Sequence, residues 1–189
     1  MAEARSANRE GRGLALVALV VSLAWLAYAL LDGLTTIGRH FVPLALLRFA
    51  LLGALATFAR VSGAGQKRLG RAGLVVAVVG AAFNMVGAVG SVVMDGWTFD
   101  PFGAGGEART GSELWYAFVI GLSAFVFAIG TALVGIAGRP IGWLRISAIL
   151  AGVLYVVGIP LGAPGHYVWI APWIALAAGL VTGAEERTE

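Results

Sequence analysis

Arg48 is the residue whose position most needs a chemical explanation, because it interrupts the apolar segment 41–59. A guanidinium in hydrocarbon costs about 2.5–3.5 kcal/mol on insertion scales, so in a membrane it faces other helices, finds a partner or reaches the interface. Asn84 lies within another apolar segment, 72–94. Its amide also needs a hydrogen-bonding partner there. These two residues predict either polar contacts between helices or contacts with a ligand.

Three carboxylates lie at the ends of neighbouring apolar segments: Asp32, Asp95 and Glu113. Arg48 lies about 10 Å below the same boundary at a helical rise of roughly 1.5 Å per residue. Its long side chain can cover much of that distance. Two interpretations follow. Arg48 forms an ion pair with Asp32 or Asp95 that fixes the packing of the first three helices, or it binds an anionic headgroup or substrate in a polar pocket open to the outside.

The chain has two histidines, His40 and His166, and both fall near the ends of apolar segments. Together with Asp32 or Glu113 they are weak candidates for a metal or haem site. Histidine ligands in haem-binding bundles generally lie inside the helices, and no paired spacing is present here. We therefore predict no metal site and no cofactor. An outward-facing enzyme that uses Glu113, Asp95, Asp32 and His166 stays as an alternative.

Several kinds of chemistry are excluded by residue types. The chain has no cysteine, which excludes disulfides, iron–sulfur ligation, thiolate zinc sites and cysteine nucleophiles. The single lysine, Lys67, lies between apolar segments, so no retinal Schiff base can form inside a helix. No intramembrane protease motif and no glycine-rich phosphate loop after a strand is found. The sequence thus contains no recognisable catalytic set, and whether the protein is an enzyme stays open.

The composition indicates that lipid surrounds most of the chain. Hydrophobic residues make up 59% of the 189 residues and charged residues 12%, against roughly 25% charged in an average soluble domain. No soluble fold of this size has an interior large enough to bury so much apolar surface. The net charge of +3 comes from short basic clusters between apolar segments, which is typical of membrane topology signals and not of nucleic-acid binding. The excess of Ala, Gly and Val and of arginine over lysine suggests a GC-rich prokaryotic genome.

Membrane-spanning segments can be assigned by length, because a bilayer core about 30 Å thick needs around 20 apolar residues in a helix. Six segments qualify: 14–31, 41–59, 72–94, 114–137, 141–159 and 167–182. We predict an all-α integral membrane bundle of about six helices over residues 14–183, with tails 1–13 and 184–189 and an outer loop 95–113. Two prolines and three glycines in 158–165 separate the last two segments. In a five-span alternative the C-terminal tail lies outside.

The basic residues predict the orientation, since cytoplasmic loops carry an excess of Lys and Arg. In a six-span chain Arg39 and Arg109 fall on one side. The other ten basic residues, apart from Arg48, fall on the opposite side: Arg5, Arg9, Arg12, Arg60, Lys67, Arg68, Arg71, Arg139, Arg145 and Arg187. The expected location is the cell membrane, with several crossings and both termini in the cytoplasm.

The favoured function at this point is an accessory or structural subunit of a membrane complex, or a homo-oligomer. It follows from the lack of a catalytic set, the few ionisable groups at depth and small residues that recur at four-residue spacing. The alternative is a carrier or binding protein for a small molecule or lipid that uses Arg48, Asn84 and the acidic residues at the outer ends of the helices. The expected partners are membrane lipids together with other membrane subunits or a second copy, and no nucleic acid.

Overall fold

The computed structural model describes the backbone of residues 2–32, 41–95, 111–139, 142–158 and 163–182. Side chains are described for residues 10–28, 30, 44–90, 121–139, 142–158 and 167–182. These regions contain six α-helices and one short 3-10 helix: α1 (Ala2–Asp32), α2 (Phe41–Val61), η2 (Ala64–Gln66), α3 (Arg68–Asp95), α4 (Gly111–Ala137), α5 (Gly142–Gly158) and α6 (Ala163–Thr182). The prediction of an all-helical protein is confirmed for the described residues.

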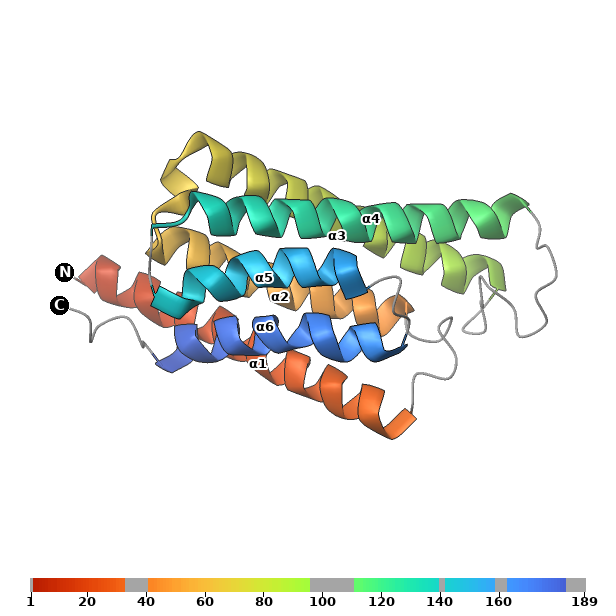
Figure 1. Ribbon diagram of the computed structural model, residues 1–189, viewed down its shortest axis with the longest axis horizontal. Coiled ribbons are helices and arrows are strands. Elements are labelled where there is room, and N and C mark those ends of the chain that lie inside the picture. The colour runs from red at the N-terminus through yellow and green to blue at the C-terminus, as the bar shows by residue number, and fades with distance from the viewer. Residues whose placement is uncertain (1, 33–40, 96–110, 140–141, 159–162, 183–189) are drawn as a thin grey trace.

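The helices run side by side as a bundle, and each packs against its neighbours in the chain (Figure 1). α6 also returns to pack against α1, so the six helices form a closed ring. α2 contacts α4 and α6 across this ring, which makes it the central helix. The first turn of α1, η2 and the last turn of α6 lie at the same end of the bundle, at the left of Figure 1.

Three stretches are long and apolar enough to cross a membrane: Glu10–Tyr28, Leu44–Val61 and Arg68–Gly90. The described parts of the other helices form shorter apolar stretches, Gly121–Ala137, Gly142–Gly158 and Tyr167–Thr182. Large apolar side chains are exposed on all six helices, among them Val20, Leu46, Val75, Ile129, Ile146 and Val168. In water so large an apolar surface would favour aggregation. The bundle is therefore compatible with a location in the membrane.

The helix boundaries differ from the predicted segments mainly at the N-terminus. α1 begins at Ala2 and includes most of the tail predicted as residues 1–13, because the Ala, Glu and Arg residues of this region favour helix. α2 begins at Phe41, the first residue of the predicted segment. α5 ends at Gly158 and α6 begins at Ala163, as expected from the prolines and glycines of this region. Pro164 falls in the first turn of α6, where its missing N–H group is not needed.

Glycines bring the backbones of α3 and α4 into direct contact. A Cβ atom added at Gly73 would lie 2.8 Å from the carbonyl oxygen of Gly130, and one added at Gly80 would lie 2.8 Å from the carbonyl oxygen of Ser123. Gly152 of α5 approaches α4 just as closely, since its added Cβ would lie 2.6 Å from the carbonyl oxygen of Ala128. Such small residues allow van der Waals packing where lipid supplies no hydrophobic driving force between helices. The recurring small residues of these helices thus pack helices of one chain together.

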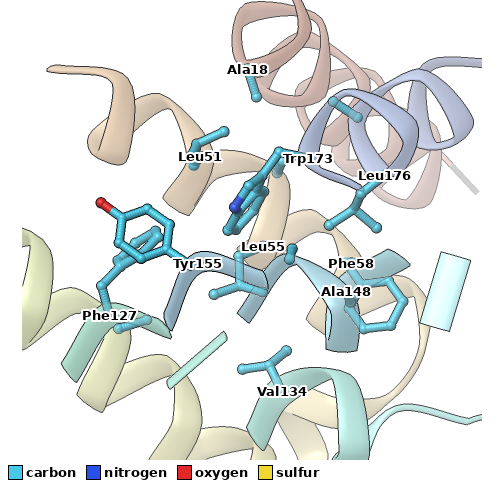
Figure 2. Close-up of a cluster of buried hydrophobic side chains, with 14 of the residues drawn as sticks. Ala18, Leu51, Leu55, Phe58, Phe127, Val134, Ala148, Tyr155, Trp173 and Leu176 are labelled. Atoms are coloured by element: carbon cyan, nitrogen blue, oxygen red, sulfur yellow. The ribbon is translucent and has the colours of Figure 1, made fainter. Parts of the chain in front are cut away.

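The hydrophobic core is centred on α2 and includes side chains from all six helices, with Ala77 and Ala81 contributed by α3. Figure 2 labels ten of its members: Ala18, Leu51, Leu55, Phe58, Phe127, Val134, Ala148, Tyr155, Trp173 and Leu176. The α2 members recur at intervals of three and four residues, as expected for one buried face of a helix. Arg48 precedes Leu51 and Leu55 on this same face. The helix that carries the unusual charge is therefore the one most surrounded by other helices.

Candidate anion site at Arg48

Arg48 is buried inside the bundle, with 1% of its surface exposed. It follows Leu47 and precedes Leu51, both fully buried, so the guanidinium belongs to the inward face of α2. The described arginines near the η2 end, such as Arg60 and Arg71, are exposed. Since polar side chains in membrane helices usually face the protein interior, the position of Arg48 agrees with the first sequence-based expectation for this residue.

Two hydroxyl groups on other helices accept hydrogen bonds from the guanidinium. Nε donates to Oη of Tyr155 on α5 at 2.9 Å, and Nη2 donates to the same oxygen. Nη1 donates to Oγ of Ser123 on α4 at 3.1 Å. Cζ of Arg48 also lies 5.3 Å from the centre of the Tyr155 ring, within the range of a cation–π interaction. Arg48 therefore joins α2, α4 and α5.

The charge of Arg48 has no acidic partner among the described side chains. The only carboxylate in this set is that of Glu10, which is exposed on α1. Hydroxyl groups satisfy the hydrogen-bonding needs of a guanidinium, but they do not neutralise its charge. A buried charge without a counter-ion is unfavourable in a medium of low dielectric constant. This part of the bundle therefore favours the presence of a negative charge.

The ion pairs expected with Asp32 or Asp95 concern side chains outside the described set. Asp32 ends α1, Asp95 ends α3 and Glu113 falls in the first turn of α4, but only their backbones are described. Pairing of Arg48 with a carboxylate of this group stays a prediction. The described polar partners connect α2 to α4 and α5, whereas the expected ion pair would have fixed the first three helices.

The hydrogen-bond donors of this cluster exceed its acceptors. A guanidinium has five N–H groups, and Arg48 uses three of them on the two hydroxyls. One N–H remains on Nη1 and one on Nη2. The Tyr155 oxygen accepts two of these bonds, so its own O–H proton remains for a further acceptor. No described residue accepts from these three donors. A carboxylate or phosphate oxygen, which only accepts, is the chemical complement of such a group.

Aromatic packing fixes the position of the Tyr155 hydroxyl. The Tyr155 ring lies 4.7 Å from that of Trp169 and 6.2 Å, edge-on, from that of Phe127. Phe127 in turn stacks on Trp173 with ring centres 5.8 Å apart. All four side chains are buried, and Figure 2 shows the Tyr155 ring among the core side chains with its hydroxyl directed away from them. The acceptor for Arg48 is thus held by packing, which reduces the cost of orienting it for binding.

Asn84 is the second polar residue that the sequence singled out, and it is fully buried in α3. Neither its amide nitrogen nor its carbonyl oxygen has a hydrogen-bond partner in the structure. Gly80, one helical turn earlier, faces the Ser123 carbonyl of α4. Residues four apart lie on the same side of a helix. Asn84 therefore belongs to the α4-facing side of α3, close to the level of the Arg48 cluster.

The side chains of the other candidate residues from the sequence lie outside the described set. His40 lies outside the described residues, and His166 lies in the first turn of α6 with its side chain outside the described set. No group of three His, Cys, Asp or Glu residues that could hold a metal ion is found among the described residues. A metal or haem site at the histidines therefore stays untested.

Sequence reasoning missed Ser123 and Tyr155, the two residues that contact Arg48. The available signal was a hydroxyl within each apolar segment, but serine often bonds to its own helix and tyrosine often lies at the membrane interface. Comparison with known protein families, curated proteins and solved structures finds no match for this chain. Function must therefore be inferred from the chemistry of the Arg48 cluster.

Proposed function

We propose that this chain is a multi-pass membrane protein, with both termini in the cytoplasm, that binds a small anionic molecule inside its bundle at Arg48. The observation that supports this proposal is the buried guanidinium, which has hydroxyl partners but no described carboxylate. It develops the carrier or binding alternative named from the sequence. Arg48 supplies the positive charge, and Ser123 and Tyr155 orient it.

An anion at this position would satisfy both needs of the cluster. Its negative charge would neutralise the guanidinium, and its oxygens would accept from the remaining N–H groups and from the Tyr155 hydroxyl. Hydrogen bonds between ionised groups are shorter and roughly twice as strong as neutral ones. Because Arg48 is already oriented by two hydroxyls, little rotamer freedom is lost when the anion binds. The arrangement therefore favours selective binding of a compact oxyanion.

The structural-subunit hypothesis has less support than the binding hypothesis. It relied in part on small residues as a surface for self-association, but Gly73, Gly80 and Gly130 pack within the chain and are not available for contacts with a second copy. The contacts of Arg48 with two other helices are nevertheless also what a purely structural residue would make. The two hypotheses differ in one respect: only the binding function requires that an anion contact Arg48 while the fold is intact.

Anion titration of the protein in nanodiscs tests the proposal. Acetate, hexanoate and inorganic phosphate are titrated by calorimetry into the wild type, Arg48→Gln and the exposed control Arg71→Gln, with empty nanodiscs as the blank. Loss of even one charge-assisted hydrogen bond corresponds to at least about tenfold weaker binding. We expect this loss for Arg48→Gln and no change for Arg71→Gln.

Two outcomes would overturn the proposal. The first is that no anion binds to the wild type above the empty-nanodisc blank. The second is that Arg48→Gln binds as tightly as Arg71→Gln. If Arg48→Gln fails to fold, Arg48→Met replaces it, because this variant removes the buried charge and leaves an apolar side chain in the core. Anion binding by Arg48→Met that is as tight as that by Arg71→Gln then counts against the proposal.

A further inference from the structure

We infer that Asn84 is a second recognition point of the same site, and that the ligand is a small carboxylate or phosphate that also carries an amide or hydroxyl group. This inference rests on the proposed anion binding at Arg48. It starts from a separate observation, the buried Asn84 amide whose nitrogen and oxygen both lack a hydrogen-bond partner.

The packing of α3 against α4 relates the two points in space. Gly73 faces Gly130, and Gly80 faces Ser123 and Phe127, so the two helices are antiparallel in this contact. Asn84 follows Gly80 by four residues, which is about 6 Å along the helix axis at roughly 1.5 Å per residue. Since the Cβ added at Gly80 meets Phe127 as well as the Ser123 carbonyl, Asn84 lies close to the level of Ser123, toward the Asp95 end of α3.

Ser123 links this level to the guanidinium, because its Oγ lies 3.1 Å from Nη1 of Arg48. The Asn84 amide is thus close to the level of the Arg48 cluster along the bundle axis. Arg48 belongs to α2 and Asn84 to α3, so the two groups approach this level from different helices. A molecule with an anionic end and a separate polar group can satisfy both.

The chemistry of the two residues indicates which polar group belongs at each end. The groups that remain at Arg48 and Tyr155 for a ligand, two N–H groups and one O–H, are donors, and so favour an oxyanion. A carboxamide offers two N–H donors and one carbonyl acceptor, and so complements a neutral group that both donates and accepts. Amides and hydroxyls have this property. A second charged group is not favoured at Asn84, because the amide carries no charge to neutralise it.

Matched probe pairs test the inference. N-acetyl-β-alanine and hexanoate have similar chain lengths and the same carboxylate, but only the first has an amide. N-acetyl-phosphoethanolamine and pentyl phosphate form the corresponding pair with a phosphate. All four are titrated into the protein in nanodiscs, and the ratio of the two affinities within each pair is compared between the wild type and Asn84→Leu.

We expect the wild type to bind the amide-bearing probe about three- to tenfold more tightly than its apolar partner, as one buried hydrogen bond allows. In Asn84→Leu, whose side chain has a similar size, this preference is lost while the affinity for hexanoate or pentyl phosphate is unchanged. The pair that shows the larger preference identifies the anionic group as a carboxylate or a phosphate.

The outcomes separate this inference from the proposed function. If hexanoate and pentyl phosphate bind through Arg48 but Asn84→Leu shows the same amide preference as the wild type, the inference about Asn84 is wrong and the anion site stands. If no probe binds, the proposed function itself fails. If Asn84→Leu is not folded, Asn84→Asp serves instead: its added negative charge should weaken binding of all four probes, and unchanged affinities overturn the inference.

Discussion

Replacement of Tyr155 by phenylalanine tests whether the tyrosine hydroxyl is what keeps the Arg48 guanidinium stable in the core. This change keeps the ring that contacts Phe127 and Trp169 and removes the oxygen that accepts from Nε and Nη2 of Arg48. We expect Tyr155→Phe to destabilise the bundle more than Arg48→Met does, although arginine is the larger and charged partner.

The expected loss of stability in each variant depends on which polar groups stay buried without a partner. Hydrogen bonds to charged groups contribute about 1.5–3 kcal/mol each, and the two bonds to Tyr155 share one oxygen. Tyr155→Phe leaves the charge buried without them, so it should cost about 2–4 kcal/mol. Arg48→Met loses these bonds and the bond to Ser123, but it removes a guanidinium whose burial costs about 2.5–3.5 kcal/mol. Its net effect should therefore be smaller than that of Tyr155→Phe by up to about 2 kcal/mol.

A double-mutant cycle measures this difference. The wild type, both single variants and the double variant are unfolded reversibly in mixed micelles with increasing sodium dodecyl sulfate, and helix content is followed by circular dichroism. When Arg48 is replaced, the Tyr155 hydroxyl no longer stabilises a buried charge, so its removal costs less stability. The double variant should consequently be more stable than Tyr155→Phe alone by up to about 2 kcal/mol.

This prediction would be refuted if Arg48→Met cost as much as Tyr155→Phe and the two effects were additive. Such a result would mean that a carboxylate already neutralises Arg48, so that its removal leaves another charge unpaired. In that case one of the variants Asp32→Asn, Asp95→Asn or Glu113→Gln should reproduce the loss.

Two further predictions concern packing and topology. Gly130→Val should destabilise the bundle by at least about 2 kcal/mol in the same unfolding assay, because a side chain there meets the backbone of α3. The control is Gly121→Ala on the same helix, which has nothing within 4 Å of its added Cβ and should change stability by less than about 1 kcal/mol. The chain has no native cysteine, so Lys67→Cys should react with a membrane-impermeant maleimide only from the cytoplasmic side, and Ala104→Cys only from the outside; labelling of both from one side would refute the predicted orientation.

The helices, and the unusual positions of Arg48 and Asn84, could be predicted from the local sequence. The apolar segments predicted helices, and each of the six described α-helices overlaps one of them, although α1 begins well before its segment. Arg48 and Asn84 could be recognised without knowledge of their neighbours, because a polar group in an apolar segment is unfavourable wherever it faces. Their burial in the structure agrees with this reasoning.

The partners of Arg48 could not be found in the same way. Ser123 and Tyr155 are 75 and 107 residues away in the sequence, and which residues face α2 depends on how α4 and α5 are rotated about their axes. The role of the small residues was equally undetermined, since a glycine strip packs as well against a second copy as against another helix of the same chain.

Sequence by itself determined that this chain is helical and apolar enough for lipid, because hydrophobicity and helix length are sums over consecutive residues. Only the tertiary structure decided that Arg48 meets two hydroxyls in the core, and that glycines of α3 and α4 are used within the chain. Contacts between distant segments depend on the rotation and axial register of the helices, which are set by packing of all six at once.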